Sequence, residues 1–332
     1  MNNYYISITN IPGIRIGHFT NDKCATGCTV VLCENGGATC GVDIRGGAPG
    51  TRETALLAPT CLVDKVNAIL LTGGSALGLA AADGVMRYCQ EQGYGFSMAR
   101  KKIPIVPAAV IYDFNLGEDG APSAQDGYEA CLQAACATEV AEGNVGAGTG
   151  ALVGKVCGTQ QAMRGGLGTA AMQFQTGLKV GVLVVVNTFG DVRSDEDNRI
   201  IAGARTKDGN RFIDTVKYII DGTKTTTQSS NTLIGVVAIN AHLGKTELTK
   251  VAQMAHVGVS QVITPAHTLY DGDTLFALAT GESEVEADVN LVGIAAAELV
   301  KKAIQRAILK SVGREGIPAY SDFSNLKKEY NG

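Results

Sequence analysis

The sequence predicts a mixed α/β or α+β protein. Strand-like runs of β-branched and aliphatic residues alternate with stretches of helical periodicity along the 332 residues. Apolar residues make up 45% of the chain and charged residues 18%, which excludes a disordered, collagenous or coiled-coil chain. One large domain or two modest domains fit this length. The net charge of -4 provides no broad positive field, so we expect no nucleic-acid partner.

Each expected element follows from its local pattern. Six runs rich in Val, Ile, Leu and Ala are typical of strands, and in chain order they cover residues 28–32, 68–72, 103–112, 180–186, 233–239 and 275–279. Apolar residues at helical spacing predict helices over residues 76–92, 245–256 and 288–310. The last of these helices is the clearest, because Gly313 follows just past its apolar stripe.

The chain shows no targeting or membrane signal. Its first residues contain neither a basic nor an apolar segment, and the most apolar uncharged stretch, 66–82, is too short for a span of about 20 residues. We therefore expect a cytoplasmic protein. Nine cysteines, all between Cys24 and Cys157, have no paired or metal-ligand spacing. Buried reduced thiols and no metal are the expectation.

Two short glycine-containing motifs suggest chemistry that their residues do not fully support. Between Gly148 and Gly154 lie five residues, where a phosphate-binding loop has four, and Lys155 is not followed by Ser or Thr. Ser75 follows a strand and opens a helix, as a nucleophile elbow does, but Leu77 stands where the elbow needs Gly. Capping of the helix N-terminus by Ser75 is the better interpretation.

Asp271 and Asp273 flank Gly272 on a loop that enters an apolar strand. If the glycine kinks the chain, both carboxylates can point into a site, although a plain Asp-Gly turn explains the same residues. No spacing ties a histidine to a nucleophile, and structural roles are expected for His18, His242, His256 and His267.

Residues 221–231 read DGTKTTTQSSN and contain no apolar side chain, and an apolar strand follows immediately. From composition alone an ordinary surface loop explains this segment. Glycine-rich stretches at 45–50, 143–154 and 164–168 allow backbone to approach backbone or ligand closely.

Collinear motifs carry a resemblance to a known family. They are IGHFT at 16–20, RGGAPGTRET at 45–54, LTGGSA at 71–76, AADGVM at 81–86, VGAGTG at 145–150, GGLG at 165–168, NT at 231–232 and DGDT at 271–274. With these motifs the chain resembles, nearly end to end, the DmpA-type peptidases of the P1 family (S58). That family includes L-aminopeptidase/D-esterases, β-peptidyl aminopeptidases and 6-aminohexanoate-oligomer (nylon) hydrolases. The resemblance implies an αββα sandwich of the DmpA/ornithine acetyltransferase type.

The resemblance also implies self-cleavage. Family members resemble N-terminal-nucleophile hydrolases, in which the precursor cuts itself and the new N-terminal Ser or Thr becomes the nucleophile. The matching bond here is Asn231-Thr232, so one compact domain, 1–332, would consist of fragments 1–231 and 232–332. A Thr hydroxyl is a weak nucleophile, but the freed α-amine, with a pKa of about 8, can accept its proton. No histidine and no cofactor are then required.

The family pattern implies further roles by position. Asp271 and Asp273 match a pair that orients the Thr hydroxyl and amine, and Asn187 matches a side-chain amide that donates to the oxyanion. Lys155 matches a site lysine, and Tyr112 matches a tyrosine that lines the cleft. A Thr nucleophile with two Asp residues is similar to the nylon-hydrolase branch.

One position departs from the aminopeptidase pattern. Val110 stands where those members carry a Glu that grips the substrate amine, which favours an endo-acting enzyme or an amide-linked oligomer substrate over recognition of a free N-terminus. The implied partners are a small peptide or amide substrate and further copies of the chain, such as a tetramer. Two alternatives remain: a Ser/His/Asp α/β hydrolase that uses Ser75, and a non-processing ligand-binding member of the fold.

Overall fold

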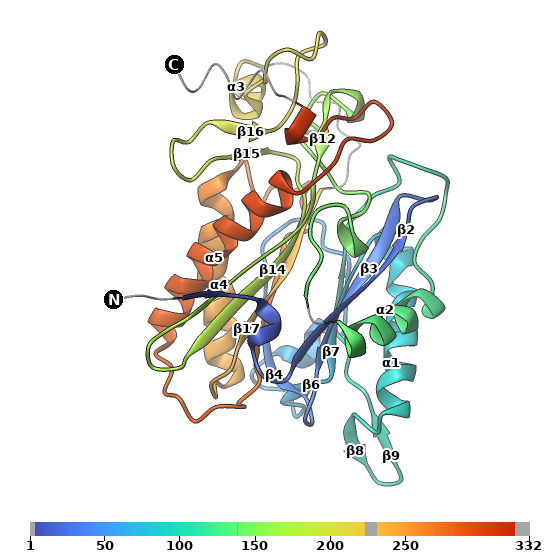
Figure 1. Ribbon diagram of the computed structural model, residues 1–332, viewed down its shortest axis with the longest axis vertical. Helices are drawn as coiled ribbons and strands as arrows, with labels where there is room; N and C mark the ends of the chain where they lie inside the picture. The colour runs from blue at the N-terminus through green and yellow to red at the C-terminus, as the bar shows by residue number, and fades with distance from the viewer. Residues whose placement is uncertain (1–3, 138, 223–230, 323–332) are drawn as a thin grey trace.

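The computed structural model describes residues 4–137, 139–222 and 231–322. Within these ranges two large β-sheets lie face to face, and helices cover the outer face of each sheet (Figure 1). This confirms the expected mixed α/β class and the αββα sandwich. Most of the polar segment, residues 223–230, lies outside the described residues.

The larger sheet has a parallel pair of strands at its centre. Within the described residues its order is β1 (Tyr4–Ile6), β13 (Gly166–Gln173), β14 (Lys179–Asn187), β17 (Thr232–Ile239), β19 (Thr274–Ala279), β4 (Ala38–Ile44) and β6 (Lys65–Val66). Strands β17 and β19 run parallel, and α4 (Lys245–Val262) connects them. Parallel neighbours need such a crossover. Together with α5 (Val289–Leu309), α4 covers the outer face of this sheet.

The second sheet carries its own pair of helices. Its order in the described residues is β2 (Ile14–Asn21), β3 (Thr26–Cys33), β7 (Ala68–Thr72), β10 (Ala108–Val110) and β5 (Thr51–Arg52). Helices α1 (Ala81–Glu91) and α2 (Ala124–Cys136) pack against each other and against its outer face (Figure 1).

Shorter elements complete the described chain. The small strands are β8 (Phe96–Met98), β9 (Lys101–Ile103), β11 (Leu152–Val153), β12 (Met163–Arg164), β15 (Asp191–Arg193), β16 (Ile200–Ala202) and β18 (Ile263–Thr264). The short helices are α3 (Thr215–Ile220) and the 3-10 turns Ile8–Asn10, Thr54–Leu57, Ser75–Ala80, Gly146–Gly148, Thr159–Gln161 and Tyr320–Asp322. In the described part of the chain, no helix is long and apolar enough to cross a bilayer.

Strand β17 is buried on both faces, which explains its continuous apolar sequence. Leu233, Val237 and Ile239 pack in the core formed with α4 and α5, whereas Ile234 and Val236 pack between the two sheets. Full burial of each such side chain contributes about 1.5–3 kcal/mol. Because side chains alternate along a strand, position 232 lies on the inter-sheet side.

Several predicted elements need correction. The strand expected at 103–112 is interrupted between β9 and β10, because Pro104 and Pro107 have no N–H for a ladder. The helix expected at 76–92 begins as a 3-10 turn and becomes α-helical only at Ala81. Ser75 does not cap it: the N-cap residues are Gly74 and Ala80, with no side-chain cap bond. The helix expected at 245–256 continues to Val262.

Candidate active site

The strand arrangement brings the predicted site residues together at one end of the central strands of the larger sheet. Thr232 begins β17, and Asp273 immediately precedes the parallel strand β19, so both lie at the same end of these strands, which is called the site edge below. Asn187 ends the antiparallel strand β14 and is paired with Thr232. Just outside the sheet, Asn231 and Asp271 form an isolated parallel bridge. Residues that are up to 86 positions apart in sequence therefore meet, from 187 to 273.

The peptide bond between Asn231 and Thr232 is buried, and its carbonyl oxygen accepts two hydrogen bonds. The Thr232 hydroxyl donates one of them, and the main-chain N–H of Gly272 donates the other over 2.8 Å. A Cβ added to Gly272 would lie 2.9 Å from Thr232 Oγ1 and 2.9 Å from Ala48 O, so a glycine is required there. The hydroxyl thus lies beside the carbonyl group that it would attack in self-cleavage, and the Gly272 N–H is directed at the oxygen that would become negative.

The two carboxylates hold different parts of the site. Asp273 Oδ1 accepts a hydrogen bond from Leu233 N over 2.7 Å. Its Oδ2 accepts from the main-chain N of His267 over 3.1 Å and lies 2.8 Å from the ring Nδ1 of the same residue. Asp271 Oδ2 accepts from the main-chain N and the hydroxyl of Thr268 over 2.7 and 2.6 Å. Asp273 therefore holds Leu233, the residue that follows Thr232, whereas Asp271 holds Thr268, three residues earlier in its own loop.

Asn187 is fixed by bonds to three neighbours. Its side-chain oxygen accepts from Lys155 Nζ over 3.0 Å and from Leu152 N over 3.0 Å, and Lys155 Nζ also donates to its main-chain oxygen over 2.9 Å. The side-chain nitrogen donates to Tyr112 O over 3.0 Å. An amide NH₂ carries two donor hydrogens, and Tyr112 uses one of them. The surrounding chain thus fixes the orientation of the Asn187 side chain and leaves one amide hydrogen without a contact to Tyr112.

Burial shifts the pKa values of three charged groups here. It lowers the pKa of the Lys155 ammonium to about 7, although the carboxylates of Asp271 and Asp113 favour the charged form. Burial raises the pKa of Asp271 to about 6, and repulsion from Asp273 acts in the same direction. Burial likewise raises the pKa of Asp113 to about 6. Groups that titrate near neutrality are common in catalytic sites.

Asp113, Gly272 and His267 were not predicted as site residues. Asp113 is buried and accepts hydrogen bonds from Gly74 N and Thr26 Oγ1, both over 2.7 Å. It follows Tyr112 directly, but a single Asp after a strand is not a specific signal. Gly272 contributes a main-chain N–H, which no sequence pattern reveals. His267 lies six residues before its partner and has no motif of its own.

Tyr112 lies next to the site edge, because its carbonyl oxygen accepts a hydrogen bond from Asn187. The half-buried ring of Tyr112 packs edge-to-face on Phe114, with centroids 5.2 Å apart. Val110 is buried at the end of β10 and offers no carboxylate. Ser75 has a left-handed backbone, with φ of 50°. Among the hydrogen bonds of the described residues, none joins its hydroxyl to a histidine, so the Ser/His/Asp alternative gains no support.

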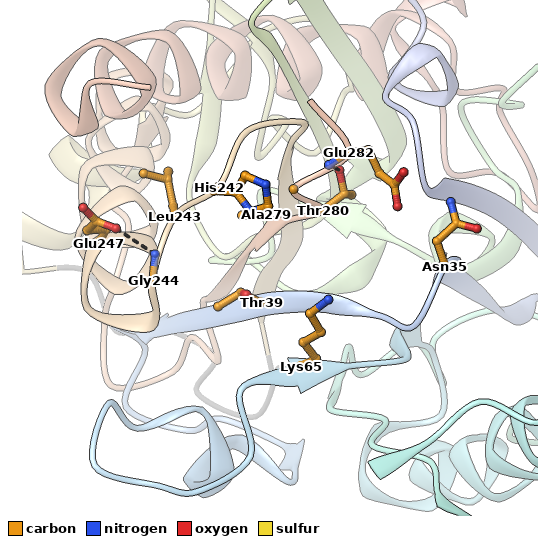
Figure 2. Close-up of a pocket in the computed structure, with 11 residues that line it drawn as sticks. Asn35, Thr39, Lys65, His242, Leu243, Gly244, Glu247, Ala279, Thr280 and Glu282 are labelled. Carbon is orange, nitrogen blue, oxygen red and sulfur yellow. Dashed lines mark hydrogen bonds between the residues drawn. The ribbon is translucent and has the colours of Figure 1, made fainter. Parts of the chain in front are cut away.

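Figure 2 shows a separate cavity, of about 450 Å³, at the far end of the same strands. Ala279, the last residue of β19, lines it, whereas Thr232 begins β17. Strand β17 runs from Thr232 to Ile239, and Ile239 pairs with Ala279. The seven residue steps from Thr232 to Ile239 correspond to about 23 Å. The side chains drawn include Lys65, His242 and Glu282 and none of the predicted site residues. This cavity is therefore not the candidate active site. Within the ranges described, no group of three or more His, Cys, Asp or Glu residues could hold a metal.

Solved structures share this fold. A β-aminopeptidase of Burkholderia sp. matches with a TM-score of 0.71 and 22% identity over 99% of this chain and 95% of that chain. The L-aminopeptidase D-Ala-esterase/amidase of Ochrobactrum anthropi matches with a TM-score of 0.72 and 19% identity over 98% and 94%. The latter is described as a prototype for the serine aminopeptidases and a new variant among the Ntn hydrolase fold. The described chain thus shares the fold of these two proteins.

Sequence comparison defines the family. The model of peptidase family S58 matches residues 7–319, and the chain belongs to this family of hydrolases. A protein of Mycobacterium tuberculosis named as an uncharacterized aminopeptidase is 40% identical over 95% of this chain and 97% of its own length. A 6-aminohexanoate-oligomer endohydrolase of Kocuria sp. is 29% identical over 83% of this chain and 75% of its own length. The resemblance on which the sequence expectations rest is confirmed.

Proposed function

We propose that this protein is a self-processing amide hydrolase that cuts its Asn231-Thr232 bond and then uses Thr232 as its nucleophile. The observation that carries the proposal is the pair of donors on the Asn231 carbonyl oxygen, namely the Thr232 hydroxyl and the Gly272 N–H. The S58 family membership and the Ntn-type fold support the same chemistry.

Self-cleavage would proceed by an acyl shift. Thr232 Oγ1 attacks the carbonyl carbon of Asn231, and the hydroxyl proton passes to the Thr232 nitrogen as the C–N bond breaks. The result is an ester between Asn231 and the Thr232 side chain, together with a free α-amine. Water then hydrolyses the ester, which leaves a carboxylate on Asn231 and restores the hydroxyl. Gly272 N–H stabilises the charge that develops on the carbonyl oxygen.

Turnover would repeat these steps on a substrate amide. The free α-amine of Thr232 accepts the hydroxyl proton as Oγ1 attacks, and it returns this proton to the leaving amine. The acyl-Thr intermediate is then hydrolysed by water. Asn187 donates to the oxyanion, and Lys155 holds the Asn187 side chain in place through its Nζ. The proposed reaction requires only these side chains, the Thr232 α-amine and water.

The proposed substrate is a small peptide or an amide-linked oligomer. The buried Val110 provides no carboxylate for a substrate amine, which favours cleavage of internal amide bonds. The 6-aminohexanoate-oligomer endohydrolase among the relatives has a name that fits such a substrate. Tyr112, with its half-buried ring, would line the cleft.

Activity on a panel of peptide anilides and linear 6-aminohexanoate oligomers tests the proposal. We expect Thr232→Ala to be inactive on every substrate and Thr232→Ser to retain some activity, since it keeps a hydroxyl and an amine. Ser75→Ala is the matched control and should keep the activity of the unmodified protein. An inactive Ser75→Ala, with an active Thr232→Ala, would instead favour the alternative that uses Ser75.

We also propose that the protein forms a homo-oligomer, such as a tetramer. Helix α5 covers the larger sheet, yet Leu291 and Ile294 on its outer face are 40% and 59% exposed. Exposed apolar side chains on one helix face fit an interface between copies. Light scattering of the native protein gives the molar mass, and a monomer at micromolar concentration would contradict this proposal.

A further inference from the structure

We propose that His267 is a positioning residue for Thr232 and acts through Asp273. Its ring Nδ1–H and its main-chain N–H hold one oxygen of Asp273, so that the other oxygen stays bonded to the N–H of Leu233. This inference rests on the proposed function, because it assigns the role relative to a Thr232 nucleophile.

The bonds around Asp273 define the direction of this chain of contacts. Asp273 is only 2% exposed, and each of its oxygens accepts a hydrogen bond from a main-chain N–H, Oδ1 from Leu233 and Oδ2 from His267. The His267 ring therefore carries its proton on Nδ1, which lies 2.8 Å from Oδ2. On the opposite side, Leu233 N lies 2.7 Å from Oδ1. The carboxylate thus connects the imidazole to the peptide unit that follows the nucleophile.

This link gains importance once the chain is cut. In the uncut chain, the covalent bond to Asn231 helps to hold Thr232. After cleavage Thr232 is a chain end, and its position depends on the β17 ladder and on the anchor at Leu233. A nucleophile that is displaced by about 1 Å can lose about 100-fold in rate. By holding Asp273 in place, His267 therefore also limits the movement of the Thr232 hydroxyl and amine.

The local backbone is built to present both donors of His267 to one oxygen. His267 has φ of 58°, in the left-handed region that residues other than glycine rarely adopt. Such a conformation persists only where its surroundings hold it. Here the main-chain N–H and the ring of the same residue both reach Asp273 Oδ2.

A second histidine fixes the plane of the His267 ring. His256, on α4, contacts it edge-to-face, with centroids 4.9 Å apart and an interplanar angle of 79°. His256 Nε2 in turn lies 3.1 Å from Asp43 O, on β4. Burial lowers the pKa of His256 to about 4, so it adds no positive charge beside His267 at neutral pH.

The other ring nitrogen of His267 distinguishes positioning from proton transfer. His267 Nε2 is buried and has no hydrogen-bond partner among the described residues. A relay through the ring would need a donor or an acceptor at this atom. The geometry therefore assigns to His267 the role of a hydrogen-bond donor through Nδ1.

Three substitutions at position 267 separate a donor role from other roles. His267→Asn places an amide N–H near the Nδ1 position, and Asn tolerates left-handed φ. His267→Gly tolerates the same φ but has no side-chain donor. His267→Gln places its amide near Nε2, away from Asp273. Each protein is checked for folding by thermal melting, and kcat and KM are measured per mole of processed chain across pH 5–9, the range usual for such profiles.

We expect His267→Gly and His267→Gln to lose at least about 10-fold in kcat with little change in KM, as for a lost transition-state interaction. His267→Asn should keep kcat within about 3-fold of the unmodified protein, since the charge-assisted hydrogen bond is restored. Its pH profile should superimpose on that of the unmodified protein.

Two results would overturn the inference. One is a folded His267→Gly protein with normal kcat. The other is a folded His267→Asn protein that is as impaired as His267→Gly, which would show that the imidazole itself is needed. Thr232→Ala in the same assay separates the two proposals: if it is active, the proposed function fails, whereas an inactive Thr232→Ala beside a normal His267→Gly contradicts only the role of His267.

Discussion

The main chain is held on both sides of Thr232, at the carbonyl group of Asn231 and at the N–H of Leu233. Gly272 and the Thr232 hydroxyl meet at the Asn231 carbonyl oxygen, and Asp273 binds the N–H of Leu233. Main-chain restraint of this kind limits how far the hydroxyl moves relative to the bond that it would attack, which is the physical basis of proximity in catalysis.

The two carboxylates allow a test of charge against shape. Asp271→Asn and Asp273→Asn preserve a turn, because Asn suits turns as well as Asp does. An ionised carboxylate near Thr232 favours an ammonium and orients the hydroxyl, which a neutral amide does not do. We expect both variants to fold but to lose about 100-fold or more in kcat, and to process more slowly. Near-normal turnover in both, measured beside the unmodified protein, would leave the pair as a structural turn.

Lys155 predicts a particular dependence of stability on pH. The folded pKa of about 7 lies below the ordinary lysine value of 10.5, so between these values the unfolded chain binds more protons and stability rises with pH. From pH 7 to pH 9, we expect the free energy of unfolding of the protein with Lys155 to rise by about 2 kcal/mol more than that of the Lys155→Met protein.

Urea unfolding at both pH values gives this difference. Both proteins carry Thr232→Ala, so that a single uncut chain unfolds in each case. Parallel pH dependences of the two proteins would show that the buried ammonium titrates normally.

At the scale of elements, close helix contact supports the outer layer of the second sheet. A Cβ on Gly84 of α1 would lie 1.6 Å from Ala124 O, and one on Gly127 of α2 would lie 2.0 Å from Ala81 O. We expect Gly84→Ala to lower the free energy of unfolding by about 1–3 kcal/mol, because the helices must separate. Gln90→Ala, at an exposed position of α1, is the control. Equal melting temperatures for the two variants would contradict this packing.

The sequence predicted the central strands well and the outer segments less well. The run at 233–239 lies within β17 and differs from it only at its first residue, because burial on both faces gives a continuous apolar run with clear ends. The high apolar content of the run at 103–112 predicts one continuous strand, but Pro104 and Pro107 interrupt it between β9 and β10. Serine often caps helices, but Ser75 has a left-handed backbone, and the helix that it begins has no side-chain cap bond.

The site was predictable only where side chains form a motif. The family resemblance indicated Thr232 and Asp273, and the strand order explains why they meet. Gly272 N–H and His267 could not be predicted: a main-chain donor leaves no signal in the sequence, and a single histidine gains meaning only when its ring is placed against a carboxylate.

At the scale of the whole molecule, the proposed cut would leave the larger sheet intact. The strands of this sheet that follow residue 231, β17 and β19, lie between β14 on one side and β4 on the other. Both of those neighbours belong to the preceding part of the chain. Hydrogen bonds along both edges would hold the two fragments together, so we expect them to coelute under native conditions and to separate only on denaturation.

The most direct test of self-cleavage at Thr232 is the mass of the denatured protein, produced and purified without added protease. We predict two fragments of 231 and 101 residues in place of the 34.4 kDa chain, with Thr at the N-terminus of the shorter one. Thr232→Ala, made in the same way, should give only the full-length mass, because it lacks the attacking hydroxyl. An active enzyme that remains a single chain, or a Thr232→Ala protein that is cut at the same bond, would contradict the account.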